Sequence, residues 1–263
     1  MKPRAPLIVG GSFICAIALA LPARVYARAS THALARVAVT APSNYARGEA
    51  DLAAKKYREA EAAFRAAIKQ KDHLAESYAG VGYAAAFLGD YKTSFEAYKQ
   101  AHALAPRNND YTYKTAFTAL YFGDFHAAIT YIDIFIKAEP KNAAGYHLRF
   151  LADGRLLRTK DEARDAGKVV ALQPNYAPAW NDWGIALANI KQFKQAIAAF
   201  NHAISLDPKN YFYYENRAQT ENYNHEPVRA LADYKRARAL DKDPATRKQL
   251  DDVISALEKQ LHK

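Results

Sequence analysis

The stretch APAWNDWGIALANIKQFKQAIAAFNHAISLDP, residues 177–208, determines the predicted fold. Its apolar residues recur every three or four positions, which is the spacing of one face of an α-helix. They form two groups: Trp180, Trp183, Gly184, Leu187 and Ala188, then Phe193, Ala196, Ile197, Phe200, Ala203 and Ile204. Asp207-Pro208 ends the second group, because the residue before a proline disfavours the helical conformation. The stretch therefore predicts a hairpin of two helices.

The same pattern recurs along the chain with a period of 34 residues, marked by Pro106, Pro140, Pro174 and Pro208. A small residue recurs in the second helix at Ala60, Ser94, Ala128, Ala196 and Ala230, and a large one follows it at Phe64, Tyr98, Ile132, Phe200 and Tyr234. The period places six units at 41–74, 75–108, 109–142, 143–176, 177–210 and 211–244. One hairpin cannot bury both of its faces, so stacked neighbours are expected to complete the core.

At these residues the chain resembles the tetratricopeptide repeat (TPR) family, whose unit is a 34-residue helix–turn–helix. The matching residues are Tyr78, Gly82, Gly89, Tyr91, Tyr98, Ala101 and Pro106 in the second unit and Trp180, Trp183, Gly184, Ala196, Phe200, Ala203 and Pro208 in the fifth. The resemblance covers residues 41–244 and implies an all-α, right-handed solenoid of six repeats. It implies little about function, because the motif residues pack helices together.

Residues 245–263 are expected to add a capping helix. Leu250, Val253, Ile254, Leu257 and Leu261 form an apolar stripe there, and the opposite side is charged. The end of a solenoid needs a helix that covers the core with its apolar side and exposes a polar side to solvent.

The fourth unit departs from the repeat pattern. Leu157-Arg158-Thr159 replaces the Gly-Asp-aromatic turn of its neighbours, and Glu162 stands where the small residue is expected. This departure has two interpretations. It could form a bend that is used in binding, or it could be sequence divergence that the fold tolerates in one repeat.

The N-terminal residues 1–27 have the three parts of a secretory signal. A short basic start precedes an apolar run of fifteen residues, Leu7–Leu21, and Val25-Tyr26-Ala27 forms a small-residue cleavage site. Fifteen helical residues rise only about 22 Å, less than the ~30 Å hydrocarbon core. We expect cleavage near Ala27, a flexible lead-in over 28–40, and a periplasmic or secreted protein. An inner-membrane anchor formed by residues 7–21 is the alternative.

Composition fits an exported helical protein with a mildly basic surface. The formal net charge is +10, and residues 28–263 hold 34 basic and 27 acidic residues that alternate rather than form runs. The only cysteine, Cys15, lies in the apolar run, so the expected mature chain needs no disulfide. Aromatic residues are not interleaved with a basic stripe, so no nucleic-acid partner is predicted.

No catalytic or metal-binding motif is found in the sequence. The eight histidines show no HExxH or other ligand spacing. A glycine-rich phosphate loop and a GxSxG turn are missing from the sequence as well. We therefore predict a protein that is not an enzyme and that uses no cofactor and no metal.

The predicted binding residues are those that the TPR resemblance places on the concave surface, lined by the first helix of each repeat. They are Tyr45, Tyr83, Phe87, Tyr113, Phe117, Leu120, Tyr121, His147, Phe212 and Tyr223. Aromatic side chains on an open face hold peptides well and also stack on sugar rings. Packing between repeats is the alternative role for the same residues. Tyr113, His147 and Asn181 stand where the chaperone-binding clamp has lysine or its partners, so Hsp70- or Hsp90-type partners are not expected.

Two functions remain open at this point. The first is a scaffold that binds a partner protein or peptide in a bacterial envelope assembly or secretion process, with membrane contact only through the signal segment. The second is an accessory protein of polysaccharide synthesis or export that binds an anionic glycan, for which mild positive charge and adjacent aromatics are suited.

Overall fold

The structure, a computed structural model, describes residues 42–262, and these form an array of helical hairpins. The predicted signal, cleavage site and lead-in lie outside the described residues. In order, the helices are α1 (Asn44–Ala53), α2 (Tyr57–Lys69), α3 (Leu74–Phe87), α4 (Tyr91–Leu104), α5 (Asn109–Phe122), α6 (Phe125–Ala138), α7 (Ala143–Arg155), α8 (Thr159–Leu172), α9 (Ala177–Asn189), α10 (Phe193–Leu206), α11 (Tyr211–Tyr223), α12 (Pro227–Leu240) and α13 (Pro244–Leu261).

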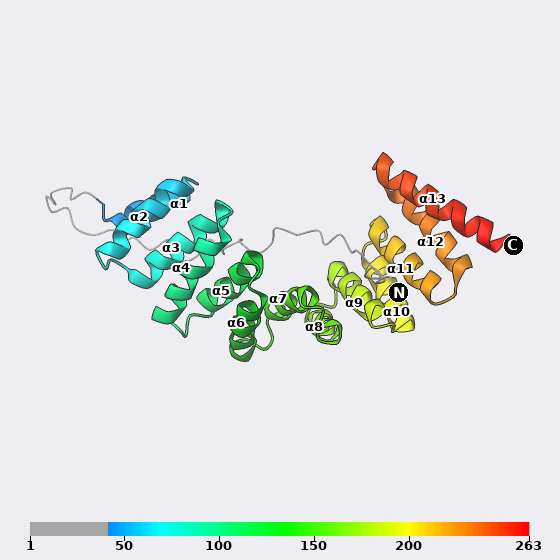
Figure 1. The fold of residues 1–263 in the computed structure, drawn as a ribbon, viewed down its shortest axis with the longest axis horizontal. Helices are drawn as coiled ribbons and strands as arrows, with labels where there is room; N and C mark the ends of the chain where they lie inside the picture. The colour runs from blue at the N-terminus through cyan, green and yellow to red at the C-terminus, as the bar shows by residue number, and fades with distance from the viewer. Residues whose placement is uncertain (1–41, 263) are drawn as a thin grey trace, which may run out of the picture.

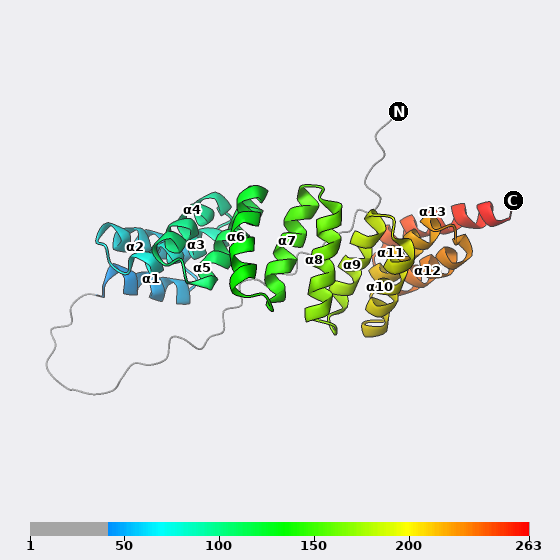
Figure 2. The same ribbon diagram turned by 90° about the horizontal axis from the view of Figure 1, so that it is seen from below.

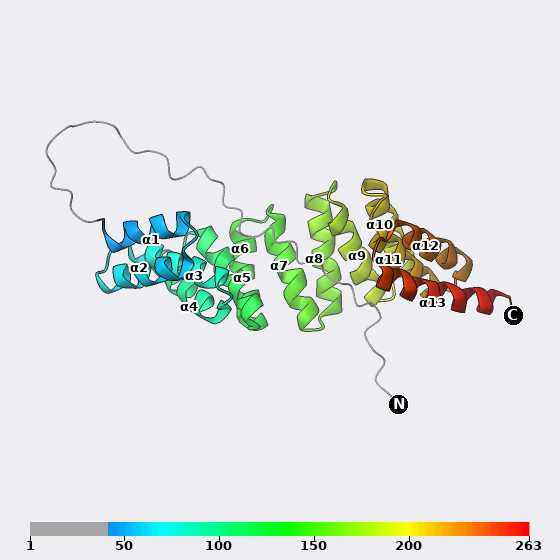
Figure 3. The ribbon, with the colours of Figure 1, turned by 90° about the horizontal axis from the view of Figure 1, so that it is seen from above.

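The helices form an all-α solenoid in which each of the six units holds two helices. The array bends into an arc, and the odd-numbered helices α1 to α11 line its inner side while the even-numbered helices lie outside (Figure 1). Views from below and above show the hairpins following one another along a single axis (Figure 2, Figure 3). No helix in residues 42–262 is long and apolar enough to cross a membrane.

The turn between the two helices of each unit repeats the same backbone conformation. Gly89 and Gly123 have φ angles of +80° and +97°, and Lys55, Leu157, Lys191 and His225 at the same place in the other units have φ between 57° and 64°. The fourth unit therefore makes the same turn as its neighbours although Leu157 replaces glycine.

Side chains of turn residues start many of the helices. Asp90, Asp124, Asn108, Asn142 and Asn210 each accept a hydrogen bond from a backbone N–H in the first turn of the following helix. Such caps satisfy donors that have no partner within the helix. The cap residues recur with the repeat, so helix boundaries are set locally.

Close packing inside each unit depends on a small residue facing a large one. Gly184 of α9 faces Phe200 of α10, and a Cβ at Gly184 would lie 2.6 Å from the Phe200 ring. Phe64, Tyr98, Ile132 and Phe200, predicted as the large residues of the second helices, are fully buried. The core is therefore a row of small clusters along the array.

Aromatic rings also join neighbouring units. The first residue of an outer helix stacks on the last turn of the next inner helix in the pairs Tyr57–Phe87, Tyr91–Tyr121 and Phe193–Tyr223, with ring centroids 4.6, 5.2 and 6.3 Å apart. The equivalent pairs around the fourth unit are Phe125 with Arg155 and Thr159 with Asn189, where no two rings meet. The joints on either side of unit 4 are thus built differently.

Candidate partner-binding face

Five aromatic residues form two groups of adjacent rings on the inner helices α3 and α5. We call Tyr83, Phe87, Tyr113, Phe117 and Tyr121 the aromatic row. Ring centroids are 4.8 Å apart for Tyr83–Phe87, 6.5 Å for Tyr113–Phe117 and 4.5 Å for Phe117–Tyr121. Residues spaced by four on a helix share one face, which explains why both helices present their rings together.

The aromatic row is partly open to solvent and partly engaged in packing. Phe87 is 41% exposed, and the other four side chains are half-buried. Tyr113 lies deepest, with its ring 5.1 Å from that of Phe135, and burial raises the pKa of Tyr113 to about 12. Flat rings held in place by such packing offer contact area to a ligand at low entropic cost.

Leu120 does not belong to this face, which corrects the prediction from the sequence. Its side chain is buried with Ala116, Ala119 and Leu148, between α5 and its neighbours. Around the helix Leu120 lies about 20° from Tyr113, the most deeply packed ring of the row, and about 100° from Tyr121, so it continues the packed edge of the row into the core.

The remaining predicted residues are spread along the array. Tyr45 packs near Phe64 and stacks on His73 at 4.4 Å, at the N-terminal end. His147 is exposed, Phe212 is half-buried beside Tyr211, and Tyr223 is 41% exposed at its stack with Phe193. These four residues do not join the aromatic row.

The inner side of units 5 and 6 carries polar side chains in addition to the aromatic Phe212 and Tyr223. The side chain of Asn216 on α11 donates a hydrogen bond of 2.8 Å to Asn181 on α9, linking two inner helices. Next to Asn181, Asp182 is half-buried, and burial together with the charge of Glu162 raises its pKa to about 7. The predicted binding residues include neither Asp182 nor Asn216, whereas Asn181 stands at an inward position already named from the sequence.

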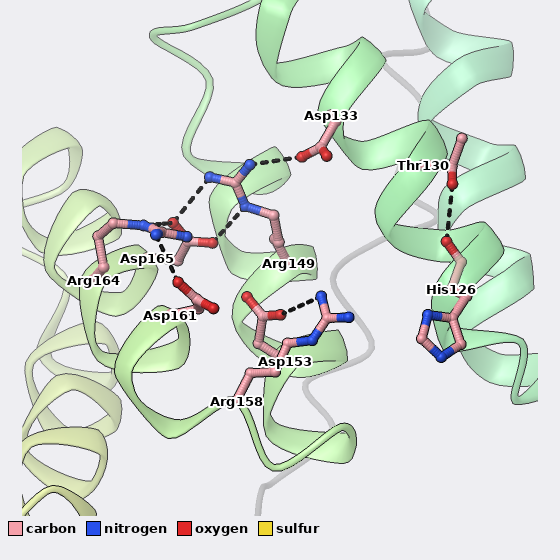
Figure 4. Close-up of polar contacts among 9 residues, drawn as sticks. All are labelled: His126, Thr130, Asp133, Arg149, Asp153, Arg158, Asp161, Arg164 and Asp165. Atoms are coloured by element: carbon pink, nitrogen blue, oxygen red, sulfur yellow. Dashed lines mark hydrogen bonds and ion pairs between the residues drawn. The ribbon is translucent and has the colours of Figure 1, made fainter.

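Arginine clamps form a second feature that the sequence analysis missed. Arg149 of α7 donates hydrogen bonds to Asp165 of α8 and to Asp133 of α6 (Figure 4). The shortest nitrogen–oxygen distance to each carboxylate is 2.6 Å. Arg217 of α11 likewise binds Asp233 of α12 and Asn201 of α10. Each arginine therefore ties its own unit to the preceding one.

The signal for these clamps is present in the sequence as a recurrence over two repeats. Arg149 and Asp165 recur as Arg217 and Asp233, 68 residues later. Asp153 recurs in the same way as Glu221. Units 4 and 6 thus share a polar interior, and a comparison of every second repeat would have revealed it.

The described residues offer little for catalysis. No group of three or more His, Cys, Asp or Glu side chains in residues 42–262 is placed to hold a metal ion. Two open depressions, one between α1 and α2 and one lined by residues 139–143 and 172–173, lie away from the aromatic row. The aromatic row is therefore the strongest candidate site for a macromolecular partner.

Two segments of the chain match tetratricopeptide repeat family models, residues 75–108 and 177–210. The chain is a tetratricopeptide repeat protein. The two matched segments have the bounds of the second and fifth units derived from the proline period. As a TPR solenoid, it has the fold of protein-interaction scaffolds, and proteins of this kind are generally not enzymes.

Curated relatives share part of this repeat array. Human tetratricopeptide repeat protein 6 is 30% identical over 124 residues, which is 46% of this chain and 24% of that protein. Human tetratricopeptide repeat protein 28 is 30% identical over 92 residues, 35% of this chain and 4% of that protein. The chain thus spans a quarter or less of the length of these relatives.

Solved structures of other repeat proteins have the same fold. A crystal structure of MamA protein has a TM-score of 0.60 and 20% identity, and the match covers 63% of this chain and 91% of that one. YrrB, described as a TPR protein with an unusual peptide-binding site, has a TM-score of 0.61 and 17% identity, with 72% and 97% covered. At these identities the similarity shows the fold.

Proposed function

We propose that this protein is a non-catalytic scaffold that binds a partner protein or peptide on the inner face of units 2 and 3, in a bacterial envelope assembly or secretion process. The aromatic row is the observation that carries the proposal, because it is an ordered, partly exposed apolar surface on the inner side of a solenoid. The envelope location rests on the secretory signal pattern of residues 1–27. The peptide-binding description of YrrB, a protein of the same fold, supports a peptide or protein as the ligand.

Site-specific photo-crosslinking tests this proposal without disturbing the packing of the row. A photoreactive phenylalanine analogue is placed at Phe87, which is 41% exposed on an inner helix, or at Leu104, which is 50% exposed on an outer helix. The chain keeps its native N-terminus and is expressed in a bacterial host. We expect a discrete crosslinked protein from position 87 and none from position 104.

A second variant links the crosslink to the aromatic row. Replacing Tyr83, Phe117 and Tyr121 by alanine should remove the crosslink at position 87 from a protein that circular dichroism shows to be folded. The matched control replaces three exposed apolar residues away from the inner helices, Leu104, Leu157 and Val228, by alanine. Equal crosslinking from both positions, or equal loss in both triple variants, would refute the proposed face.

The glycan-binding function is distinguished by the identity of the captured species. A crosslinked product that glycosidases degrade and proteases leave intact would replace the protein partner with a polysaccharide. Leu120 cannot serve as a discriminating position between the two, because it is buried.

A further inference from the structure

Charge is distributed unequally between the two sides of the solenoid. The six inner helices, α1 to α11, carry eight acidic and five basic residues, a net charge of −3. The six outer helices, α2 to α12, carry eight acidic and fourteen basic residues, a net charge of +6. The inner side is therefore acidic although the whole chain is basic, with a formal charge of +10.

Most of the basic residues of the inner helices are already held by carboxylates. Lys114 binds Asp110 at 2.8 Å, and Arg149 and Arg217 form the two clamps described above. Their charges are thus largely neutralised by those carboxylates. Asp153 and Glu221 are buried and have raised pKa values, so they add little negative charge to the inner surface near neutral pH.

Asp182 and Glu215 are two of the acidic residues of the inner helices that form no ion pair within residues 42–262; Glu49, Asp51, Glu76 and Glu221 are the others. Helix α9 contains no lysine or arginine, and neither carboxylate takes part in an ion pair within residues 42–262. They are the sequence neighbours of Asn181 and Asn216, whose hydrogen bond joins α9 to α11. Glu215 occupies the repeat position of Tyr113, three units earlier, so the periodicity places it on the inner side.

We infer that the inner face takes a cationic segment of a partner protein, with apolar side chains on the aromatic row and lysine or arginine beside Asp182 and Glu215. This inference rests on the proposed function and adds the chemistry of the partner. Neighbouring helices lie 8–10 Å apart, so α5 and α9 are separated by roughly 20 Å along the inner side. An extended segment of 12 residues reaches about 40 Å and covers both regions. Complementary charge would also raise the association rate and favour one orientation of the bound segment.

The test uses the purified full-length chain and three fluorescein-labelled peptides of 12 residues, measured by fluorescence anisotropy. One alternates leucine and lysine, one leucine and glutamate, and one serine and lysine. We expect the leucine–lysine peptide to bind at least tenfold more tightly than each of the others, because it alone satisfies both regions. Equal binding of the leucine–lysine and serine–lysine peptides would overturn the inference.

Variants that remove the two negative charges test whether Asp182 and Glu215 contribute to peptide binding. Asp182→Asn with Glu215→Gln is expected to weaken the leucine–lysine peptide about fivefold to tenfold, in line with two partly exposed charge pairs. Its control, Glu59→Gln with Asp252→Asn, removes the same charge from exposed positions outside the inner helices and should leave affinity unchanged. Equal weakening by both variants would show nonspecific attraction and refute the acidic contact.

A pH series gives an independent readout. The pKa of Asp182 is raised to about 7, and the groups that face it are Glu162 of α8, Tyr213 of α11 and Asn181 on its own helix. Asp182 gains its negative charge as the pH rises from 6 to 8, so affinity for the leucine–lysine peptide should rise over that range. The rise should vanish in Asp182→Asn. A crosslink at Phe87 without any peptide binding would overturn the cationic inference and leave the proposed function standing.

Discussion

At the scale of single residues, the unusual groups are carboxylic acids inside units 4 and 6. Asp153 and Glu221 occupy equivalent repeat positions and are 2% and 5% exposed. Burial and neighbouring carboxylates raise the pKa of Asp153 to about 6 and that of Glu221 to about 7, despite Arg158 lying 3.7 Å from Asp153 (Figure 4). Each acid is more easily protonated in the folded chain than in the unfolded one, so each destabilises the fold once it ionises.

Asp153→Asn should therefore stabilise the protein at neutral and alkaline pH. The pKa of Asp153 is raised from 3.8 to about 6. Because each pKa unit corresponds to about 1.4 kcal/mol, we expect the free energy of unfolding at pH 8 to rise by about 1–3 kcal/mol. The gain should shrink between pH 6 and pH 4, because the destabilisation by Asp153 is lost as the pH falls from its folded pKa of about 6 toward its unfolded value of 3.8.

Urea titrations at pH 4, 6 and 8 measure this effect. Asp252→Asn, at an exposed position on α13, serves as the control and should show no comparable dependence on pH. A gain from Asp153→Asn that is equal at pH 4 and pH 8 would mean that packing, not ionisation, is responsible.

At the scale of helices, the arginine clamps replace apolar contacts that other units use. Arg217 and Asp233 stand where the second unit has Val81 and Ala97. Arg217 donates to both carboxylate oxygens of Asp233, at 2.5 and 2.7 Å, and reaches Asn201 on the preceding unit. A bidentate pair of this kind fixes the relative position of α10, α11 and α12.

Removing one member of the clamp should cost more than removing both. Arg217→Val leaves the carboxylate of Asp233 buried without its cation, and we expect a loss of about 3 kcal/mol in the free energy of unfolding. Arg217→Val with Asp233→Ala recreates the apolar pair of the second unit and should recover most of that loss. Thermal and urea unfolding of the two single variants and the double variant measure the coupling. Additive losses would show that the two residues act independently.

At the scale of the whole array, α13 closes the C-terminal end. Leu250, Ile254 and Leu257 pack against Tyr214 and Tyr234 of the last unit. Leu250→Ala should lower the free energy of unfolding by about 2–4 kcal/mol, because a fully buried leucine leaves a cavity. Val253→Ala on the same helix, at a 39% exposed residue, should cost less than about 1 kcal/mol. Equal losses in urea unfolding would contradict the capping role.

The overall fold could be predicted from the sequence because every unit repeats the same local pattern. The 34-residue period sets the hairpins, and Phe64, Tyr98, Ile132 and Phe200 are buried where the pattern predicts core. The clamp residues could not be read from a single unit, since Arg149 and Asp165 are polar residues at positions expected to be apolar. Their meaning depends on contacts between units, which a search for one motif does not test.

The candidate site was predicted less completely than the fold. Helical spacing correctly grouped Tyr113, Phe117 and Tyr121, whose successive ring centroids lie 6.5 and 4.5 Å apart along the helix. The same spacing misplaced Leu120, which lies beside Tyr113 at the packed edge of the row, about 100° from Tyr121 around the helix. In units 5 and 6 the prediction, which was guided by aromatic residues, included Phe212 and Tyr223 but neither Asp182 nor Glu215.

The unequal joints between units have a mechanical consequence. Aromatic stacks join units 1 to 2, 2 to 3 and 5 to 6, whereas the two joints around unit 4 have none. Helices also meet over more residues at α2–α3 and α4–α5 than at α6–α7, α8–α9 and α10–α11. The Arg149 clamp joins unit 3 to unit 4 and the Arg217 clamp joins unit 5 to unit 6, so within residues 42–262 the joint between units 4 and 5 has neither a stack nor a clamp. Under tension along its axis, the molecule would act as a spring of uneven stiffness that extends first between units 4 and 5.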